Sequence, residues 1–66
     1  MERNVRLNWD DLVIEAIKRR KEQRLTQKQL AVIAGVSGPT LNSFEQKKTS
    51  ITLDSAIKIL QCLDLA

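Results

Sequence analysis

The chain has 66 residues, enough for one domain with a modest hydrophobic core, and its 11 Lys and Arg against 8 acidic residues give a net charge of +3 that favours an anionic partner. A single cysteine, Cys62, and no histidine argue against an intramolecular disulfide, a zinc site or a Cys–His nucleophile; without a glycine-rich phosphate loop or a convincing pair of catalytic acids, we expect no enzyme, no cofactor and no metal. No long apolar run suggests a signal peptide or a membrane span, so we expect a protein of the reducing cytoplasm with no membrane partner.

A recurring pattern predicts where helices begin: a polar capping residue follows one apolar residue and precedes another by four positions. It occurs at Asn8, Thr26 and Ser37, and more weakly at Thr52. The side-chain oxygen of such a cap satisfies a backbone N–H of the first turn, while the two apolar residues form a hydrophobic staple. Thr26 and Gln29 also have the spacing of a capping box. We therefore predict an N-terminal arm at 1–8 and helices at about 9–23, 27–34, 38–46 and 53–63.

The first and last predicted helices carry apolar residues at the helical period, which indicates one buried face on each. The predicted inward face of the first helix holds Trp9, Leu12, Val13, Ala16, Ile17 and Arg20, and that of the last holds Leu53, Ala56, Ile57, Leu60 and Leu63. Short loops around Leu25 and Gly35 force neighbouring helices to pack closely. The sequence therefore predicts an all-α fold, a compact bundle of four or five helices forming a single domain over residues 9–66.

The stretch between Thr26 and Glu45 has the composition of a helix-turn-helix. Ala31 is small where the next helix crosses, and Gly35 follows a last helical turn, where a left-handed backbone is free of a Cβ penalty. The apolar residues Leu30, Ala34, Val36, Leu41 and Phe44 fall on the inner faces. The segment Thr26-Gln-Lys-Gln-Leu-Ala-Val-Ile-Ala-Gly-Val-Ser37 resembles the core motif of the Cro/repressor (Xre-like) helix-turn-helix family, which implies a lambda-repressor-like DNA-binding fold.

This resemblance implies a sequence-specific transcription regulator, a dimeric repressor that binds operator DNA by inserting helix 38–46 into the major groove. Arg20 and Glu45 resemble the structural Arg–Glu salt bridge of the family. The segment from Thr52 to Leu65, preceded by Asn42-Ser-Phe-Glu45, is more particularly similar to HipB-like antitoxins. The alternative function is therefore a protein-binding module of that type, which neutralises a toxin kinase and autoregulates its operon.

The start of helix 38–46 departs from the family pattern. Family members commonly place Gln, Arg or Asn there, whereas neither Gly38 nor Pro39 has a side chain that donates a hydrogen bond. Proline is tolerated in a first helical turn because its missing N–H would be unpaired there, and Gly38 lets the backbone approach DNA closely. We expect modest direct readout of bases, with a larger share from DNA shape. The predicted base-reading residues are Ser37, Gly38, Pro39, Thr40 and Ser43.

Contacts with DNA phosphates are expected on both sides of this helix. Gln27 matches the phosphate-binding glutamine of the family, at a helix start whose N–H groups are free. Lys47 and Lys48 are the strongest charged candidates, and Arg3 and Arg6 are placed to reach a groove from the arm. The predicted phosphate-binding residues are Thr26, Gln27, Lys28, Asn42, Gln46, Lys47, Lys48 and Thr49.

Some of these residues also have a plainer interpretation. The run Lys18-Arg-Arg-Lys21 is typical of a solvated helix face, and Lys47 with Lys48 is also compatible with a solubilising loop. Trp9 and Phe44 lie on inward faces, which favours core packing over stacking on nucleic acid. Arg24 stands where the family often has glycine, and a left-handed backbone there costs about 1 kcal/mol.

The apolar end of the chain predicts a homodimer. Leu65 has no obvious helix in this sequence to cover it, and we expect Leu63 and Leu65, with Ile51, to be covered by a partner subunit. The predicted dimer interface is Ile51, Leu63 and Leu65. A two-fold dimer of this type places its two recognition helices about 34 Å apart, one turn of DNA.

Overall fold

The computed structural model describes residues 8–66, which form four α-helices and no strand. The helices are α1 (Trp9–Glu22), α2 (Gln27–Ala34), α3 (Gly38–Glu45) and α4 (Leu53–Cys62). All four starts agree with the prediction, and the ends of α1, α3 and α4 come one residue earlier than predicted. The all-α fold is confirmed, with four helices in this range. Arg3, Arg6 and all of the predicted arm except Asn8 lie outside the described residues.

Each helix begins at its predicted cap. The side-chain oxygens of Asn8, Thr26, Ser37 and Thr52 each accept a hydrogen bond from the backbone N–H three positions later, over 3.0 to 3.2 Å. The N–H of Thr26 also donates to Oε1 of Gln29 at 2.9 Å, which completes the predicted capping box. The helix starts are thus fixed by local hydrogen bonds that the sequence carries within four residues.

All four helices also end in one way, with a left-handed residue followed by a residue whose N–H bonds back to the last turn. The left-handed residues are Arg24 (φ 59°), Gly35 (φ 75°), Lys47 (φ 66°) and Asp64 (φ 59°). The returning N–H groups belong to Leu25, Val36, Lys48 and Leu65, and their acceptors lie 2.8 to 3.1 Å away, as in a Schellman motif. Three of the four left-handed residues are not glycine, and Arg24 is one of them.

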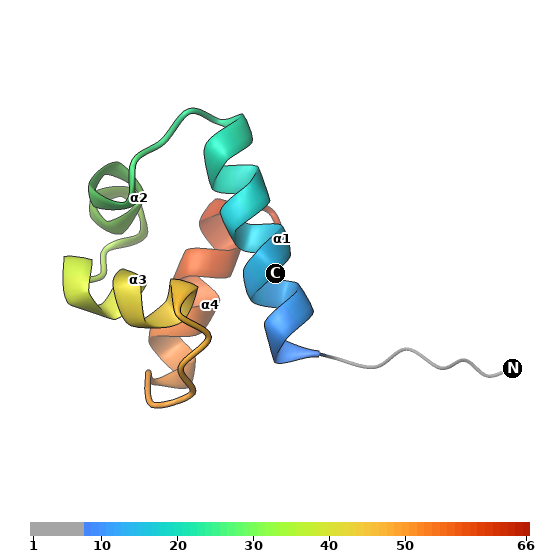
Figure 1. Ribbon diagram of the computed structural model, residues 1–66. Helices are drawn as coiled ribbons and strands as arrows, with labels where there is room; N and C mark the ends of the chain where they lie inside the picture. Colours follow the sequence, from blue (N-terminus) through green and yellow to red (C-terminus); the bar gives the residue numbers. More distant parts are fainter. Residues whose placement is uncertain (1–7) are drawn as a thin grey trace, which may run out of the picture.

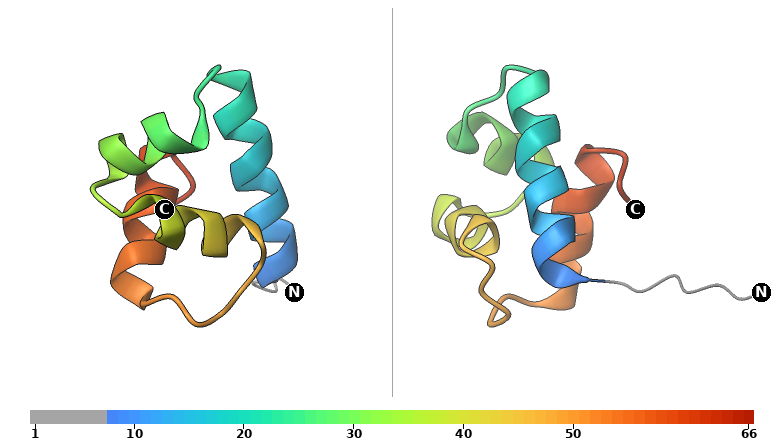
Figure 2. Two further views of the ribbon diagram at one scale, coloured as in Figure 1. Left: turned by 60° about the vertical axis from the view of Figure 1, so that its left-hand side comes forward. Right: turned by 45° about the vertical axis from the view of Figure 1, so that its right-hand side comes forward.

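In Figures 1 and 2, α2 and α3 lie together on one side of α1, and α4 packs against both of them. The end of the chain returns to α1, where Nη1 of Arg19 donates to the carbonyl oxygens of Leu63 at 3.0 Å and Asp64 at 3.3 Å. Glu15 holds the same guanidinium at 3.2 Å. Because unpaired carbonyls at a helix C-terminus attract a cation, Arg19 fastens the end of α4 to α1.

All four helices contribute to one core. Its fully buried large side chains are Val13, Leu30, Leu41, Phe44, Ile59 and Leu63. Trp9 packs against this core from the start of α1, with its ring 5.4 Å from that of Phe44 and nearly perpendicular to it, at 87°. The interpretation of Trp9 and Phe44 as core aromatics is therefore confirmed. Within residues 8–66, no helix is long and apolar enough to cross a membrane.

Two predictions about α4 and the chain end are wrong. Leu53 is 75% exposed and Ile57 is 37% exposed, whereas Ile59, which was not assigned to the inward face, is fully buried. Leu63 does not lack a cover, because it is 1% exposed inside the core of its own chain. Leu65 is half-buried against the same core. The reason is the turn at Asp64, which folds the chain end back over the bundle and removes Leu63 from any free surface.

Candidate nucleic-acid interface

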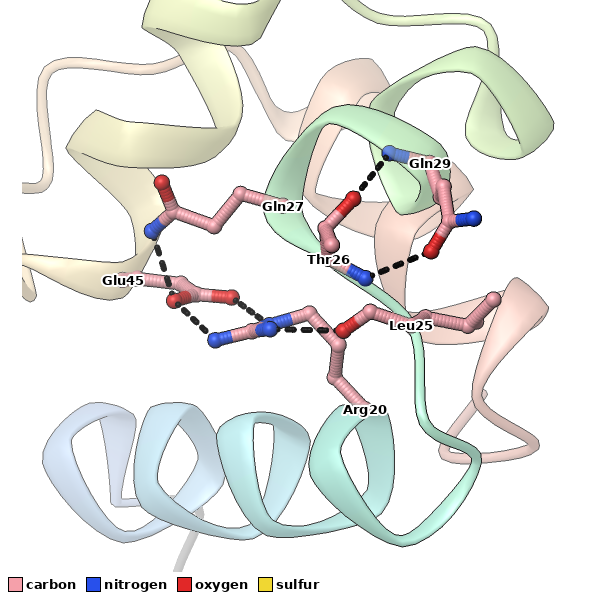
Figure 3. A network of polar contacts seen from close by, with 6 residues as sticks. All are labelled: Arg20, Leu25, Thr26, Gln27, Gln29 and Glu45. Atoms are coloured by element: carbon pink, nitrogen blue, oxygen red, sulfur yellow. Dashed lines mark hydrogen bonds and ion pairs between the residues drawn. The ribbon is translucent and has the colours of Figure 1, made fainter.

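A polar network joins the three helices that position the candidate DNA-binding surface (Figure 3). Nε of Arg20 on α1 donates to Oε2 of Glu45 at the end of α3 over 2.7 Å, and Nη2 donates to Oε1 over 3.2 Å. Nη1 of Arg20 donates to the carbonyl oxygen of Leu25 at 2.7 Å, just before α2. The two side chains are only 12% and 9% exposed. The predicted pair Arg20–Glu45 is thus present, with a bidentate geometry that fixes the angle between its elements.

Gln27 is the part of this network that sequence reasoning missed. Its Nε2 donates to Oε1 of Glu45 at 2.8 Å, so the side chain is already held by α3 (Figure 3). An amide nitrogen carries two hydrogens, and the second is available to a phosphate oxygen. The network therefore orients Gln27 for the role predicted for it. No local spacing signals this contact, because 18 residues separate the two side chains.

The start of α2 presents backbone donors. Both the Oγ1 and the N–H of Thr26 already form hydrogen bonds with Gln29 in the capping box. The N–H groups of Gln27 and Lys28 are the first two of the helix and have no acceptor within it. Since Lys28 is exposed and Gln27 half-buried, this turn offers free N–H groups beside one positive charge. That arrangement suits a phosphate.

The first turn of α3 carries the predicted base-reading residues. The hydroxyls of Ser37 and Thr40 are 2.7 Å apart and share one hydrogen bond, so the pair keeps one free hydroxyl hydrogen. Pro39 is exposed, and a Cβ added at Gly38 would meet nothing within 4 Å. Packing therefore does not require glycine at position 38. Its missing side chain instead leaves the backbone open to an approaching surface.

A hollow lined mainly by hydroxyl-bearing residues adjoins this turn. It has a volume of about 310 Å³ and is lined by Pro39, Thr40, Ser43, Ser50, Ile51, Thr52 and Ser55. Three of the five predicted base-reading residues thus meet at one recess, together with the loop before α4. The hydroxyls of Thr40 and Ser43 both donate and accept hydrogen bonds, which is compatible with more than one base edge.

The candidate phosphate residues after α3 form an exposed edge. Asn42, Gln46, Lys47, Lys48 and Thr49 are all exposed. The left-handed backbone at Lys47 turns the chain sharply there. Between Gln23 and Leu53, Glu45 is the only acidic residue, and it is paired with Arg20. The whole helix-turn-helix region therefore presents unpaired positive charge and no competing negative charge.

Comparison with known proteins matches this arrangement to a family. A family model described as helix-turn-helix covers residues 17–66, which include every base-reading and phosphate-binding candidate from Thr26 to Thr49. No curated protein sequence matches the chain.

Proposed function

The chain belongs to the helix-turn-helix family of the Cro/repressor type, which is a family of DNA-binding proteins. We propose that it is a sequence-specific repressor that acts as a homodimer on operator DNA. The observation that carries the proposal is the region from Gln23 to Leu53, in which the only acid is neutralised by Arg20 and the first turn of α3 is exposed. In this proposal α3 enters the major groove, and the bound protein represses transcription by blocking polymerase. Its place of action is the reducing cytoplasm, where Cys62 stays a free thiol.

Affinity and specificity come from different parts of this surface. The start of α2 and the edge from Asn42 to Thr49 bind phosphates on either side of the groove and set the register of α3. Ser43 and the one free hydroxyl hydrogen of the Ser37–Thr40 pair read base edges, while Pro39 offers apolar contact to a thymine methyl. With no bidentate side chain in this turn, the rest of the specificity comes from the shape of the DNA.

The function is tested by an electrophoretic mobility shift with promoter DNA from the protein's own locus and with a scrambled duplex of equal length. We expect the promoter DNA to bind at least about a thousandfold more tightly at physiological salt, as specific regulators do. Equal affinity for both duplexes would contradict sequence-specific regulation. Absence of binding to either duplex would contradict the DNA-binding role of the surface itself.

The double variant Lys47→Gly, Lys48→Ala separates DNA binding from folding. It removes two exposed charges, so we expect weaker binding to every sequence and a log–log salt dependence shallower by up to about 1.8, which is about 0.9 for each phosphate that is no longer neutralised. Stability should rise, by up to about 1 kcal/mol, because glycine relieves the left-handed backbone at position 47. Salt-dependent binding and urea denaturation measure the two effects. Unchanged affinity and salt slope would remove both lysines from the interface.

The proposed dimer needs an apolar surface that one chain leaves uncovered. Of the three residues predicted from the sequence, Ile51 and Leu65 are half-buried, and Ile51 borders a hollow of about 190 Å³ together with exposed Leu53. We place the two-fold contact on Ile51, Leu53 and Ile57, since Leu53 and Ile57 lie one turn apart on the outer face of α4.

Leu53→Asp tests this dimer. An aspartate in the first turn of α4 suits the helix dipole, so folding should be preserved while dimerisation and cooperative operator binding fall together. Analytical ultracentrifugation with and without DNA measures both. Ile14→Asp is the matched control, because Ile14 is an exposed apolar residue on α1, 51% accessible, and should leave the dimer intact. A Leu53→Asp variant that dimerises normally would contradict the proposed contact.

A second candidate function is that of a HipB-like antitoxin, which binds a toxin kinase as well as its operator. Two observations favour a protein-binding role: the missing hydrogen-bonding side chains at Gly38 and Pro39, and the apolar side chains that α2 exposes at Val32 and Ile33. Repeating the mobility shift with the product of the neighbouring gene tests it. A larger complex or released DNA supports the role, and an unchanged shift contradicts it.

A further inference from the structure

The outer face of α2 exposes two apolar side chains, Val32 and Ile33, which neither DNA binding nor the proposed dimer uses. Val32 is 75% exposed and Ile33 is 60% exposed. They line a shallow hollow of about 370 Å³ together with Leu25, which is half-buried, and with Lys28 and Gln29, which are exposed. The five residues follow the helical period, so they form one stripe, here called the α2 stripe.

Folding accounts for Leu25 of the α2 stripe, which packs against the core, but not for Val32 and Ile33. The helix buries Leu30, Ala31 and Ala34 on its opposite side, and this face, together with the Gln27–Glu45 hydrogen bond, attaches it to α3 and α4. Valine and isoleucine are among the weaker helix formers, because their branched side chains lose rotamer freedom in a helix. At two neighbouring exposed positions of an 8-residue helix they neither stabilise the helix nor fill the core. An exposed apolar patch of this kind indicates a surface that another molecule covers.

The charge around the α2 stripe restricts what covers it. Lys28 lines the hollow itself, Arg24 precedes Leu25, and no acidic residue occurs between Gln23 and Phe44. A partner with an apolar surface rimmed by carboxylates therefore matches both the apolar side chains of the stripe and the positive charges around it. DNA does not, because its phosphates find no apolar complement in Val32 and Ile33. A second copy of the stripe matches less well, since both surfaces would bring Lys28 and Arg24 and neither would bring a carboxylate from this region.

We propose that the α2 stripe docks an amphipathic helix of another protein, with apolar residues spaced three or four apart and Asp or Glu beside them. The proposal rests on the protein-binding role above and names the surface and the chemistry of its partner. The docked helix places its apolar side chains between Leu25, Val32 and Ile33, as ridges pack into grooves, while its acids face Lys28 and Arg24. Gly38 and Pro39 stay free for DNA, whereas Lys28, which is also a candidate phosphate contact, is shared between the partner and DNA.

The test uses two synthetic helical peptides with the same leucine stripe, one flanked by glutamates and the other by lysines. Titrated into the ¹⁵N-labelled protein up to millimolar concentration, the glutamate peptide should shift the amide signals of Leu25, Val32 and Ile33, and the lysine peptide should not. Val32→Gln with Ile33→Gln should weaken the glutamate peptide at least about tenfold, because exposed apolar anchors dominate such contacts. Glutamine is a good helix former, so the fold is kept. Lys28→Glu should reverse the preference between the two peptides.

Three outcomes overturn the proposal: no shift on α2 with either peptide, equal shifts with both, or unchanged binding to the double glutamine variant. A fourth is loss of self-association in that variant, measured by ultracentrifugation, which would make the α2 stripe an interface between copies of this chain. The double variant should shift operator DNA as the wild type does. A protein that binds DNA but neither peptide therefore refutes this inference alone, whereas one that binds the glutamate peptide but no DNA refutes the proposed repressor.

Discussion

Replacing Glu45 with alanine is expected to lower the free energy of unfolding by about 3 kcal/mol, because it leaves the guanidinium of Arg20 nearly buried without its carboxylate. The amide of Gln27 loses its acceptor in the same step. In a domain of this size each kcal/mol moves the melting temperature by about 4–8 °C, so the midpoint should fall by about 12 °C or more. Thermal denaturation followed by circular dichroism measures the change.

Two milder variants identify the cause of this loss. Glu45→Gln keeps the shape of the contact and removes the charge, so its effect should be intermediate. Gln27→Ala removes one hydrogen bond to a carboxylate and should cost about 1–2 kcal/mol, less than Glu45→Ala. If Glu45→Ala keeps wild-type stability but fails to bind DNA, Glu45 acts at the interface and its structural assignment is wrong.

Pro39→Glu should produce the largest change in DNA affinity, a loss of at least about a hundredfold. The side chain at position 39 is exposed in the first turn of α3, where a carboxylate would face phosphates and base edges with no cation to pair with. Folding should be almost unaffected, because two small effects oppose each other. The glutamate interacts favourably with the N-terminal end of the helix dipole, while loss of the proline makes the unfolded chain more flexible, and each effect is worth less than about 1 kcal/mol. A mobility shift and a melting curve on the same preparation separate the two effects.

The matched control is Pro39→Gln, which has the same shape as the glutamate variant and no charge. It should bind DNA far more tightly than Pro39→Glu, and its added amide is able to change which operator is preferred. Equal binding by wild type and Pro39→Glu would mean that the first turn of α3 does not enter the groove. That result would contradict the proposed orientation on DNA.

The features that were predictable from the sequence are those set by neighbours along the chain. The caps Asn8, Thr26, Ser37 and Thr52 act on N–H groups three residues later, so their oxygens fix each helix start whatever the rest of the fold does. Gly35 likewise closes α2 through its own φ of 75°. The bridge between Arg20 and Glu45 was identified from the family resemblance, which supplied a long-range contact that spacing alone does not contain.

The features that were not predictable depend on how the helices meet. Periodicity predicts an apolar face on α4 but not how that face is oriented, so it places Leu53 and Ile57 inward and does not include Ile59, which is the buried residue. The cover over Leu63 comes from the turn at Asp64 and from Arg19, which lies 44 residues earlier in the chain. Gln27 reaches Glu45 only because α1 and α3 already hold that carboxylate in place.

The ring contact between Trp9 and Phe44 gives the domain a built-in optical probe. Trp9 is the only tryptophan and the chain has no tyrosine, so ultraviolet fluorescence excited at the indole band comes from one position. That position lies where the first turn of α1 meets the last turns of α3. Its emission therefore reports whether α1 is seated on α3, and a change of signal that precedes the loss of helicity would reveal α1 detaching before α2, α3 and α4 unfold.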